Sequence, residues 1–140
     1  MPEPTPPQPV WMPTAAVAAG GALGALARFG VEVALLATVD SVLLAASLSL
    51  GAVNVLGAAG LGGLLGWIDR HGGPDALRPL VGIGGLGAFT TFSGFVAHLR
   101  VLEAEAGAWA TALFFMGSCC AAGVLFDAAR NAPADGAGPS

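Results

Sequence analysis

One stretch of the sequence combines residue types that can bind ions with a composition apolar enough for the interior of a membrane. The stretch from Gly82 to Phe95 contains four glycines within its first six residues, together with two threonines, one serine and three phenylalanines. Glycine destabilises a helix interior by about 1 kcal/mol relative to alanine, so this run predicts that the helix opens. Opened backbone at membrane depth persists only where protein or a polar pathway takes over its hydrogen bonds. Such breaks are typical of ion and substrate sites.

An opened helix of this kind offers ligands to cations and to anions. If it opens between Gly87 and Thr90, the freed backbone carbonyls can coordinate a small cation such as sodium. The N–H groups at the start of the next half-helix can bind an anion. Phe92 and Phe95 share a helix face, and the positive edge of an aromatic ring can contact a small anion. Alone, such a stripe indicates ordinary packing, but beside the glycines it favours an ion site. Further donors are the hydroxyl groups of Thr90, Thr91 and Ser93 and the amide of Asn54.

Four apolar segments are long enough to cross a bilayer, and this stretch lies in the third of them. The chain has 140 residues, of which 55% are hydrophobic and 10% charged, whereas soluble domains carry roughly 25% charged residues. A spanning helix needs ~20 residues. We therefore expect an all-α membrane protein with four transmembrane helices, the third broken near its middle, at 87–90. The expected helices are 14–38, 42–68, 80–99 and 107–126, in a membrane domain 14–128 between a disordered proline-rich leader (1–13) and a disordered tail (129–140).

Small residues at four-residue spacing predict close helix packing. Gly20 and Gly24 in the first helix, and Ala58, Gly62 and Gly66 in the second, fall on one face of each helix, where they let backbones approach. Asn54 extends the second set. Its amide needs hydrogen-bond partners in hydrocarbon, so it faces either another helix or a pathway.

Two ionisable residues, Arg28 and Glu32, lie near the end of the first helix. Ionisable residues at membrane depth are usually functional or paired. Their spacing of four places them on one helix face. We therefore expect a structural ion pair.

The charge distribution hardly favours one orientation in the membrane over the other. The net charge is −4 without a single lysine, which argues against nucleic acid as a partner. Four crossings place Arg70, Arg78 and Arg130 on one side of the membrane and Arg28 and Arg100 towards the other, so the positive-inside bias is almost nil. This suggests insertion in both orientations and an antiparallel, dual-topology dimer.

Three runs of residues resemble the motifs of the Fluc (CrcB) fluoride channel family. The third-helix signature of that family is similar to the run from Gly87 to Phe95, which reads Gly-Ala-Phe-Thr-Thr-Phe-Ser-Gly-Phe. Val53-Asn54 in the second helix and the run from Gly20 to Phe29 resemble the other two motifs. The resemblance covers residues 15–126, and its most specific part is Thr-Thr-Phe-Ser-x-Phe with the upstream Val-Asn.

The resemblance implies a passive, fluoride-selective channel, multi-pass in the plasma membrane (the inner membrane of a cell with two), that exports cytoplasmic fluoride. It also implies an antiparallel homodimer and a structural sodium ion at the dimer interface. Carried over by motif, the sodium ligands are the backbone carbonyls of Gly87 and Thr90, and Arg28 is structural. The implied fluoride pathway consists of Phe92, Phe95, Asn54, Ser93, Thr91 and Ser118.

The sequence departs from the family pattern at two positions. Gly94 stands where the family usually has a hydroxyl residue. The tyrosine often found early in the fourth helix is absent, and Phe114 or Phe115 takes its place. Some members of the family are heterodimers of two related chains, so a partner chain is an alternative to the homodimer.

Two other functions use different features of the sequence. A small-multidrug-type, proton-coupled antiporter needs an acidic residue in its first helix, for which Glu32 is the candidate. A Glu32→Gln change would abolish antiport and leave a fluoride channel largely active. In a non-transporting membrane scaffold, the motifs would serve packing alone. We expect no enzyme, since the sequence holds no Ser-His-Asp set, metal-ligand cluster or pair of acids at membrane depth.

Overall fold

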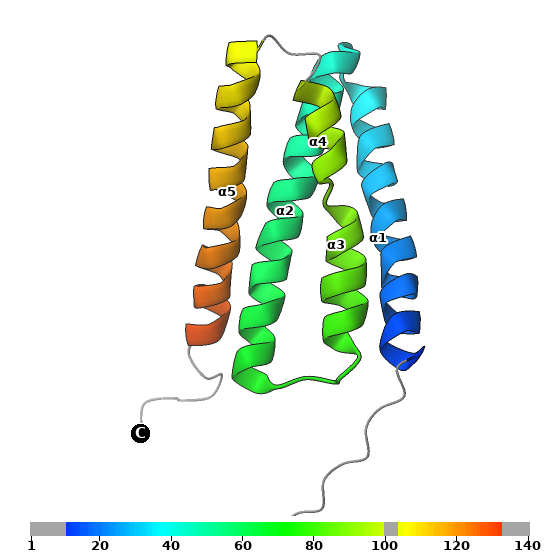
Figure 1. Cartoon of the computed structure of the whole chain (residues 1–140), viewed down its shortest axis with the longest axis vertical. Helices are drawn as coiled ribbons and strands as arrows, with labels where there is room; N and C mark the ends of the chain where they lie inside the picture. Colours follow the sequence, from blue (N-terminus) through cyan, green and yellow to red (C-terminus); the bar gives the residue numbers. More distant parts are fainter. Residues whose placement is uncertain (1–10, 100–103, 133–140) are drawn as a thin grey trace, which may run out of the picture.

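The computed structural model describes residues 11–99 and 104–132, which form helices joined by short connections. The helices form four rods. The first, second and fourth rods are single helices, and the third is a series of three elements that follow one another (Figure 1). Rods that are consecutive in the chain run in opposite directions. The elements are α1 (Trp11–Thr38), α2 (Val42–His71), the π-helix η1 (Arg78–Leu86), α3 (Gly87–Phe89), α4 (Phe92–Leu99) and α5 (Ala104–Asn131).

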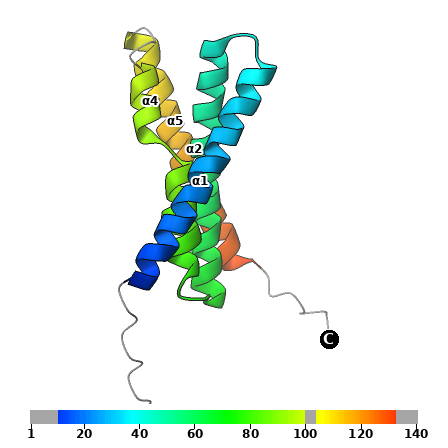
Figure 2. The same cartoon turned by 90° about the vertical axis from the view of Figure 1, so that its right-hand side faces the viewer.

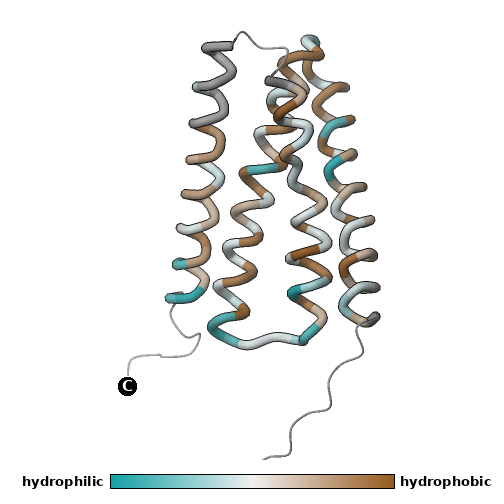
Figure 3. The backbone as a smooth tube through the Cα atoms, viewed as in Figure 1, coloured by the Kyte–Doolittle hydropathy of each residue, from teal (hydrophilic) through white to brown (hydrophobic). Residues whose placement is uncertain are grey.

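The described residues confirm the predicted all-helical class. Three helices are long and apolar enough to cross a membrane, namely Met12–Thr38, Val42–His71 and Leu113–Asn131. Hydrophilic residues lie mainly near the lower end of the bundle and in the upper half of α1 (Figure 3).

The helices extend beyond several of the predicted bounds. α1 begins at Trp11, because proline is tolerated in the first turn of a helix and Pro13 does not delay its start. α2 continues to His71, where Gly72 ends it with φ +70° and an N–H bond to the Ile68 carbonyl. α5 begins at Ala104 and reaches Asn131. Most of the predicted leader and tail, residues 1–10 and 133–140, lies outside the described residues.

Glycines bring α1 into backbone contact with η1. A Cβ atom on Gly20 would collide with the Leu80 carbonyl oxygen, and one on Gly24 with the carbonyl oxygen of Gly85. From the other side, a Cβ on Gly84 would collide with the Val17 carbonyl oxygen. This confirms the predicted close approach, which lets membrane helices pack tightly without a hydrophobic force between them.

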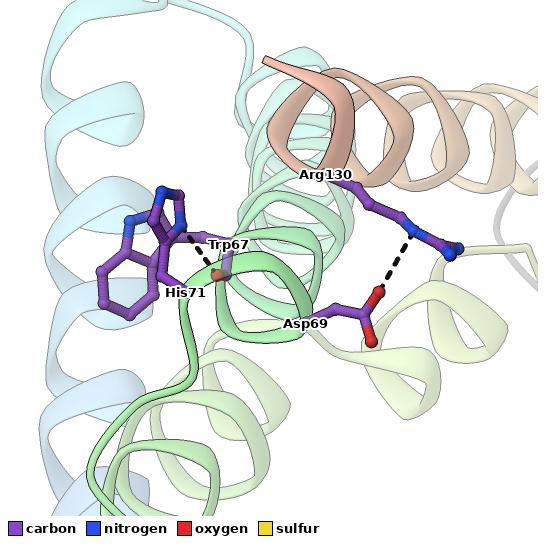
Figure 4. A network of polar contacts seen from close by, with 4 residues as sticks. All are labelled: Trp67, Asp69, His71 and Arg130. Carbon is purple, nitrogen blue, oxygen red and sulfur yellow. Dashed lines mark hydrogen bonds and ion pairs between the residues drawn. The ribbon is translucent and has the colours of Figure 1, made fainter. Parts of the chain in front are cut away.

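The second helix uses its glycines against α5. A Cβ atom on Gly62 would collide with the Ala122 carbonyl oxygen, and one on Gly66 with that of Phe126. At the lower end of this contact, Asp69 and Arg130 form an ion pair of 3.2 Å, half-exposed on both sides (Figure 4). An exposed pair of this kind stabilises by about 1 kcal/mol at most, so close packing is the main link between α2 and α5.

The last turn of α2 is closed by an aromatic stack. The rings of Trp67 and His71 lie 5.3 Å apart at 28°, and His71 Nδ1 is 3.1 Å from the Trp67 carbonyl oxygen (Figure 4). This contact stabilises the last turn of α2 before the chain turns towards η1.

The upper halves of the rods diverge. Figure 2 shows α4 and α5 leaning to one side and α1 and α2 leaning to the other. The two pairs of elements separate from the level of the α3–α4 junction upwards.

Two neighbouring glycines of α1 test the α1–η1 contact. We expect Gly20→Ala to destabilise the protein, because the added methyl group meets backbone that cannot rotate away. Gly21→Ala should be neutral or stabilising, since nothing lies within 4 Å of its Cβ position and alanine favours a helix by about 1 kcal/mol over glycine. The measurement is the temperature at which each purified variant loses its monodisperse elution in detergent. Equal temperatures for both variants would contradict the close contact.

Candidate ion site

The helix stops for two residues at the α3–α4 junction. α3 ends at Phe89, Thr90 adopts an extended conformation with φ −75° and ψ 153°, and α4 begins at Phe92. The Thr90 N–H still donates to the Leu86 carbonyl, at 3.1 Å. The regular backbone bonding of α3 therefore ends at Thr90, and Thr91 needs partners elsewhere.

Asn54 of α2 supplies those partners. Its Oδ1 atom accepts from the Thr91 N–H at 2.8 Å, and its Nδ2 atom donates to the Thr91 carbonyl at 3.1 Å. The second N–H of Nδ2 donates to the Leu50 carbonyl at 2.9 Å. The Asn54 amide thus binds the backbone of the α3–α4 junction, and both its donors are used within the chain.

Thr91 in turn begins α4. Its Oγ1 atom accepts from the Gly94 N–H at 3.2 Å, which is the bond by which an N-cap threonine stabilises a helix start. A Cβ atom on Gly94 would lie 3.0 Å from Leu50 Cδ2 and 3.2 Å from Thr91 Cγ2. The glycine at this position therefore leaves room for the capped turn against α2.

These bonds release two carbonyl groups. In a continuous helix the Gly87 carbonyl would accept from the Thr91 N–H, and the Thr90 carbonyl from the Gly94 N–H. The first of these donors is bound to Asn54 and the second to Thr91 Oγ1. Gly87 retains one bond, from Thr90 Oγ1 at 3.2 Å. Two backbone oxygens, both predicted as sodium ligands, are thereby left without their helical N–H partners.

A cavity of about 300 Å³ lies beside the junction, between α2, α3, α4 and α5. We call it the break cavity. Phe92 and Phe115 meet at its wall in an edge-to-face contact, with ring centroids 5.8 Å apart at 68°. Phe115 faces the predicted pathway residue Phe92, although sequence reasoning could not choose between Phe115 and Phe114. The predicted residues that line the cavity are Asn54, Gly87, Thr90, Thr91, Phe92 and Ser118.

Ser118 carries the one polar group in the break cavity that is buried without a bond. Its Oγ atom is buried and has no hydrogen-bond partner. Buried hydroxyl groups are normally paired, and an unpaired one costs about 1–3 kcal/mol. Ser118 is therefore a residue of the cavity wall whose hydroxyl group has a hydrogen-bonding capacity that the fold does not use.

A second cavity, of about 520 Å³, lies between α1, α2 and α4 in the diverging half of the bundle. We call it the outer cavity. Ser93 lines it, at 3.5 Å from Thr91 Oγ1. Thr91 lines both cavities, so the peptide held by Asn54 lies between them.

The predicted ion pair of Arg28 with Glu32 is not formed. The only ion pair within the described ranges joins Asp69 to Arg130, and Arg28 and Glu32 both line the outer cavity instead. Their spacing permits contact, but an open cavity beside α1 lets both charged groups turn towards it. Phe95, the remaining predicted pathway residue, lies in α4 with a side chain outside the described part of the structure.

Comparison of the sequence with known proteins places the chain in one family. The family model described as "CrcB-like protein, Camphor Resistance (CrcB)" matches residues 15–129. A protein of Alteromonas mediterranea named "Fluoride-specific ion channel FluC" is 44% identical over 115 residues, which cover 78% of this chain and 87% of its own. The protein of the same name from Novosphingobium aromaticivorans is 38% identical over 110 residues, 77% of this chain and 85% of its own.

A third relative, "Fluoride-specific ion channel FluC 2" of Symbiobacterium thermophilum, is 43% identical over 111 residues, 79% of this chain and 87% of its own. No solved structure matches the chain. The matched region spans all the elements described above, from α1 to α5. The chain therefore belongs to the CrcB family and is a multi-pass membrane protein.

Proposed function

We propose that this protein is a passive, fluoride-selective channel of the plasma membrane that exports cytoplasmic fluoride. The names of its relatives support this function. The observation that carries it in this chain is the buried, unpaired hydroxyl of Ser118 in the wall of the break cavity. Neither the antiporter nor the scaffold has a comparable observation in its favour.

The chemistry of the break cavity suits a small anion that accepts strong hydrogen bonds. Fluoride accepts the strongest hydrogen bonds of the halides, and Ser118 offers it a donor. The edge of an aromatic ring such as Phe92 carries partial positive charge. None of the described residues that line this cavity is charged, so the anion is bound weakly enough to leave, as conduction requires.

Export by this route needs no coupled energy source. An inside-negative membrane potential drives an anion outwards by about 2.3 kcal/mol per 100 mV. Hydrogen fluoride, a weak acid, crosses membranes as the neutral molecule and ionises inside. The anion then leaves through the channel, and its intracellular concentration falls.

We further propose that η1, α3 and α4 form one membrane crossing, interrupted at Thr90 and Thr91, within an antiparallel, dual-topology homodimer. Phe92 and Phe115 are 65% and 46% exposed, which leaves the aromatic wall of the break cavity open on one side. A second copy of the chain, or a related chain, would close that side and keep lipid out of the pathway.

A structural sodium ion at the dimer interface fits the oxygens released at the junction. Alkali cations prefer uncharged oxygen ligands, and the Gly87 and Thr90 carbonyls lack their helical partners for the reasons given above. One chain supplies two such oxygens. Two antiparallel copies would supply a symmetric set, and the ion would hold the two junctions together.

Fluoride efflux from liposomes that contain the purified chain alone tests the function. We expect rapid fluoride release, measured with a fluoride electrode, and no chloride release under the same gradient. Phe92→Ile keeps an apolar side chain of similar bulk but removes the ring edge, so efflux should fall at least tenfold. If folded, monodisperse protein releases no fluoride, the homodimeric channel is wrong.

The Ser118→Ala substitution distinguishes an effect on fluoride transport from an effect on stability. Ser118→Ala removes a hydroxyl that has no partner in the fold, so the thermal stability should stay the same or rise. Fluoride efflux should fall several-fold, because the cavity loses its free donor. Ser47→Ala is a matched control, since the Ser47 hydroxyl donates to the Leu43 carbonyl at 2.9 Å, within its own helix. Equal efflux from both variants would remove Ser118 from the pathway.

Asn54→Asp tests the junction itself. The carboxylate keeps the acceptor for the Thr91 N–H but loses both donors, which leaves the Leu50 and Thr91 carbonyls facing negative charge. We expect a loss of stability of about 1–3 kcal/mol and loss of fluoride efflux. Asn131→Asp, the same exchange at the exposed end of α5, should change neither quantity. Wild-type efflux from Asn54→Asp would show that the junction does not depend on the amide.

A further inference from the structure

Among the described residues, one carboxylate lines the outer cavity. Glu32 and Arg28 are the charged residues in this described wall, and no ion pair joins them. The described residues that complete the wall, from α2 and α4, include Ser49, Leu50 and Ser93, and all are uncharged. The described wall therefore contributes one positive and one negative side chain to the field inside this cavity.

The two charges act on the same ion in opposite directions. A cleft lined by charge of one sign concentrates ions of the other sign, because its low-dielectric walls focus the field. Arg28 raises the local concentration of an anion, whereas an ionised Glu32 lowers it. At physiological ionic strength, charges are screened over about 8 Å, so both act mainly inside the cavity.

The outer cavity borders the break cavity at Thr91. Thr91 lines both cavities, and the hydroxyl groups of Thr91 and Ser93 lie 3.5 Å apart at the inner end. An anion that moves from the outer cavity to the break cavity has passed Glu32 on α1 and arrives at these hydroxyl groups.

We propose that Glu32 limits fluoride conduction by opposing the attraction of Arg28 in the outer cavity. This proposal rests on the proposed channel function and adds a rate-setting residue to it. Glu32 does not hold the fold together, since it makes no ion pair and is an exposed residue of α1. Its substitution therefore changes the field without disturbing the helix packing.

The test compares fluoride efflux from liposomes containing the wild-type chain, Glu32→Gln and Glu32→Lys, at low and at high concentration of an impermeant salt. At low salt, Glu32→Gln should conduct about threefold faster than the wild type and Glu32→Lys faster still; the expected change for one charge is smaller than the roughly tenfold or larger effect of a whole cleft lined by charge of one sign. In ~1 M salt, where the screening length is ~3 Å, the three rates should converge.

Asp40→Asn is the matched control, because it removes one negative charge from the connection between α1 and α2 without changing the lining of the outer cavity. Its efflux should equal that of the wild type. Equal rates for wild type, Glu32→Gln and Glu32→Lys at low salt would overturn the role of Glu32 while leaving the channel intact. A salt-independent change would also overturn it, since that marks a structural effect. If the wild type itself releases no fluoride, the channel function fails, and this proposal fails with it.

Discussion

The hydrogen bonds between Asn54 and Thr91 are the interaction on which the ion site depends. An interrupted helix inside a membrane exposes backbone groups that cost several kcal/mol each unless they are paired. The Asn54 amide pairs the N–H and the carbonyl of one residue at once, as a neighbouring peptide would. Once Thr91 is held outside the helix, its hydroxyl caps α4, and the Gly87 and Thr90 carbonyls lose their helical donors. One amide side chain therefore determines where the chain turns, where the next helix starts and which oxygens are free.

Close packing of small residues places this junction. α1 contacts η1 through Gly20, Gly24 and Gly84, so the segment before the junction is fixed against a long, straight helix. On the opposite side, a Cβ on Gly57 would collide with Thr90 Cγ2, and this glycine lets the junction lie directly against α2. Above the junction, α4 and α5 lean away from α1 and α2 (Figure 2), and the outer cavity lies there between α1, α2 and α4.

Much of this arrangement is predictable from single residues. The rest could not be predicted, and the reasons can be identified. The glycine spacing in the first two helices predicts the close contacts, because a missing side chain has the same effect whichever helix approaches. The need of Asn54 for partners is predictable as well. The identity of its partner is not, since Thr91 lies 37 positions away and only the packing of α2 against the third rod brings them together.

Two further outcomes depend on the tertiary environment. Four-residue spacing allows Arg28 and Glu32 to pair, but the cavity beside α1 decides which way they turn. Phe114 and Phe115 both line the break cavity, because the contact of Gly62 and Gly66 with α5 sets the rotation of α5 about its axis. Periodicity along α5 alone does not supply that rotation, because the helix is apolar on most of its surface.

The position of Thr91 between the two cavities has a consequence for control of the flux. Moving this peptide aside would break both bonds to Asn54 and the cap of α4 together, so the junction resists acting as a gate. For a conducting protein, we expect ions to pass beside this fixed peptide, through a passage that does not close. A cell would then adjust the flux through the number of channel copies that it makes. Because the channel has no closed state that could stop a leak, the residues that line the passage have to reject chloride by themselves.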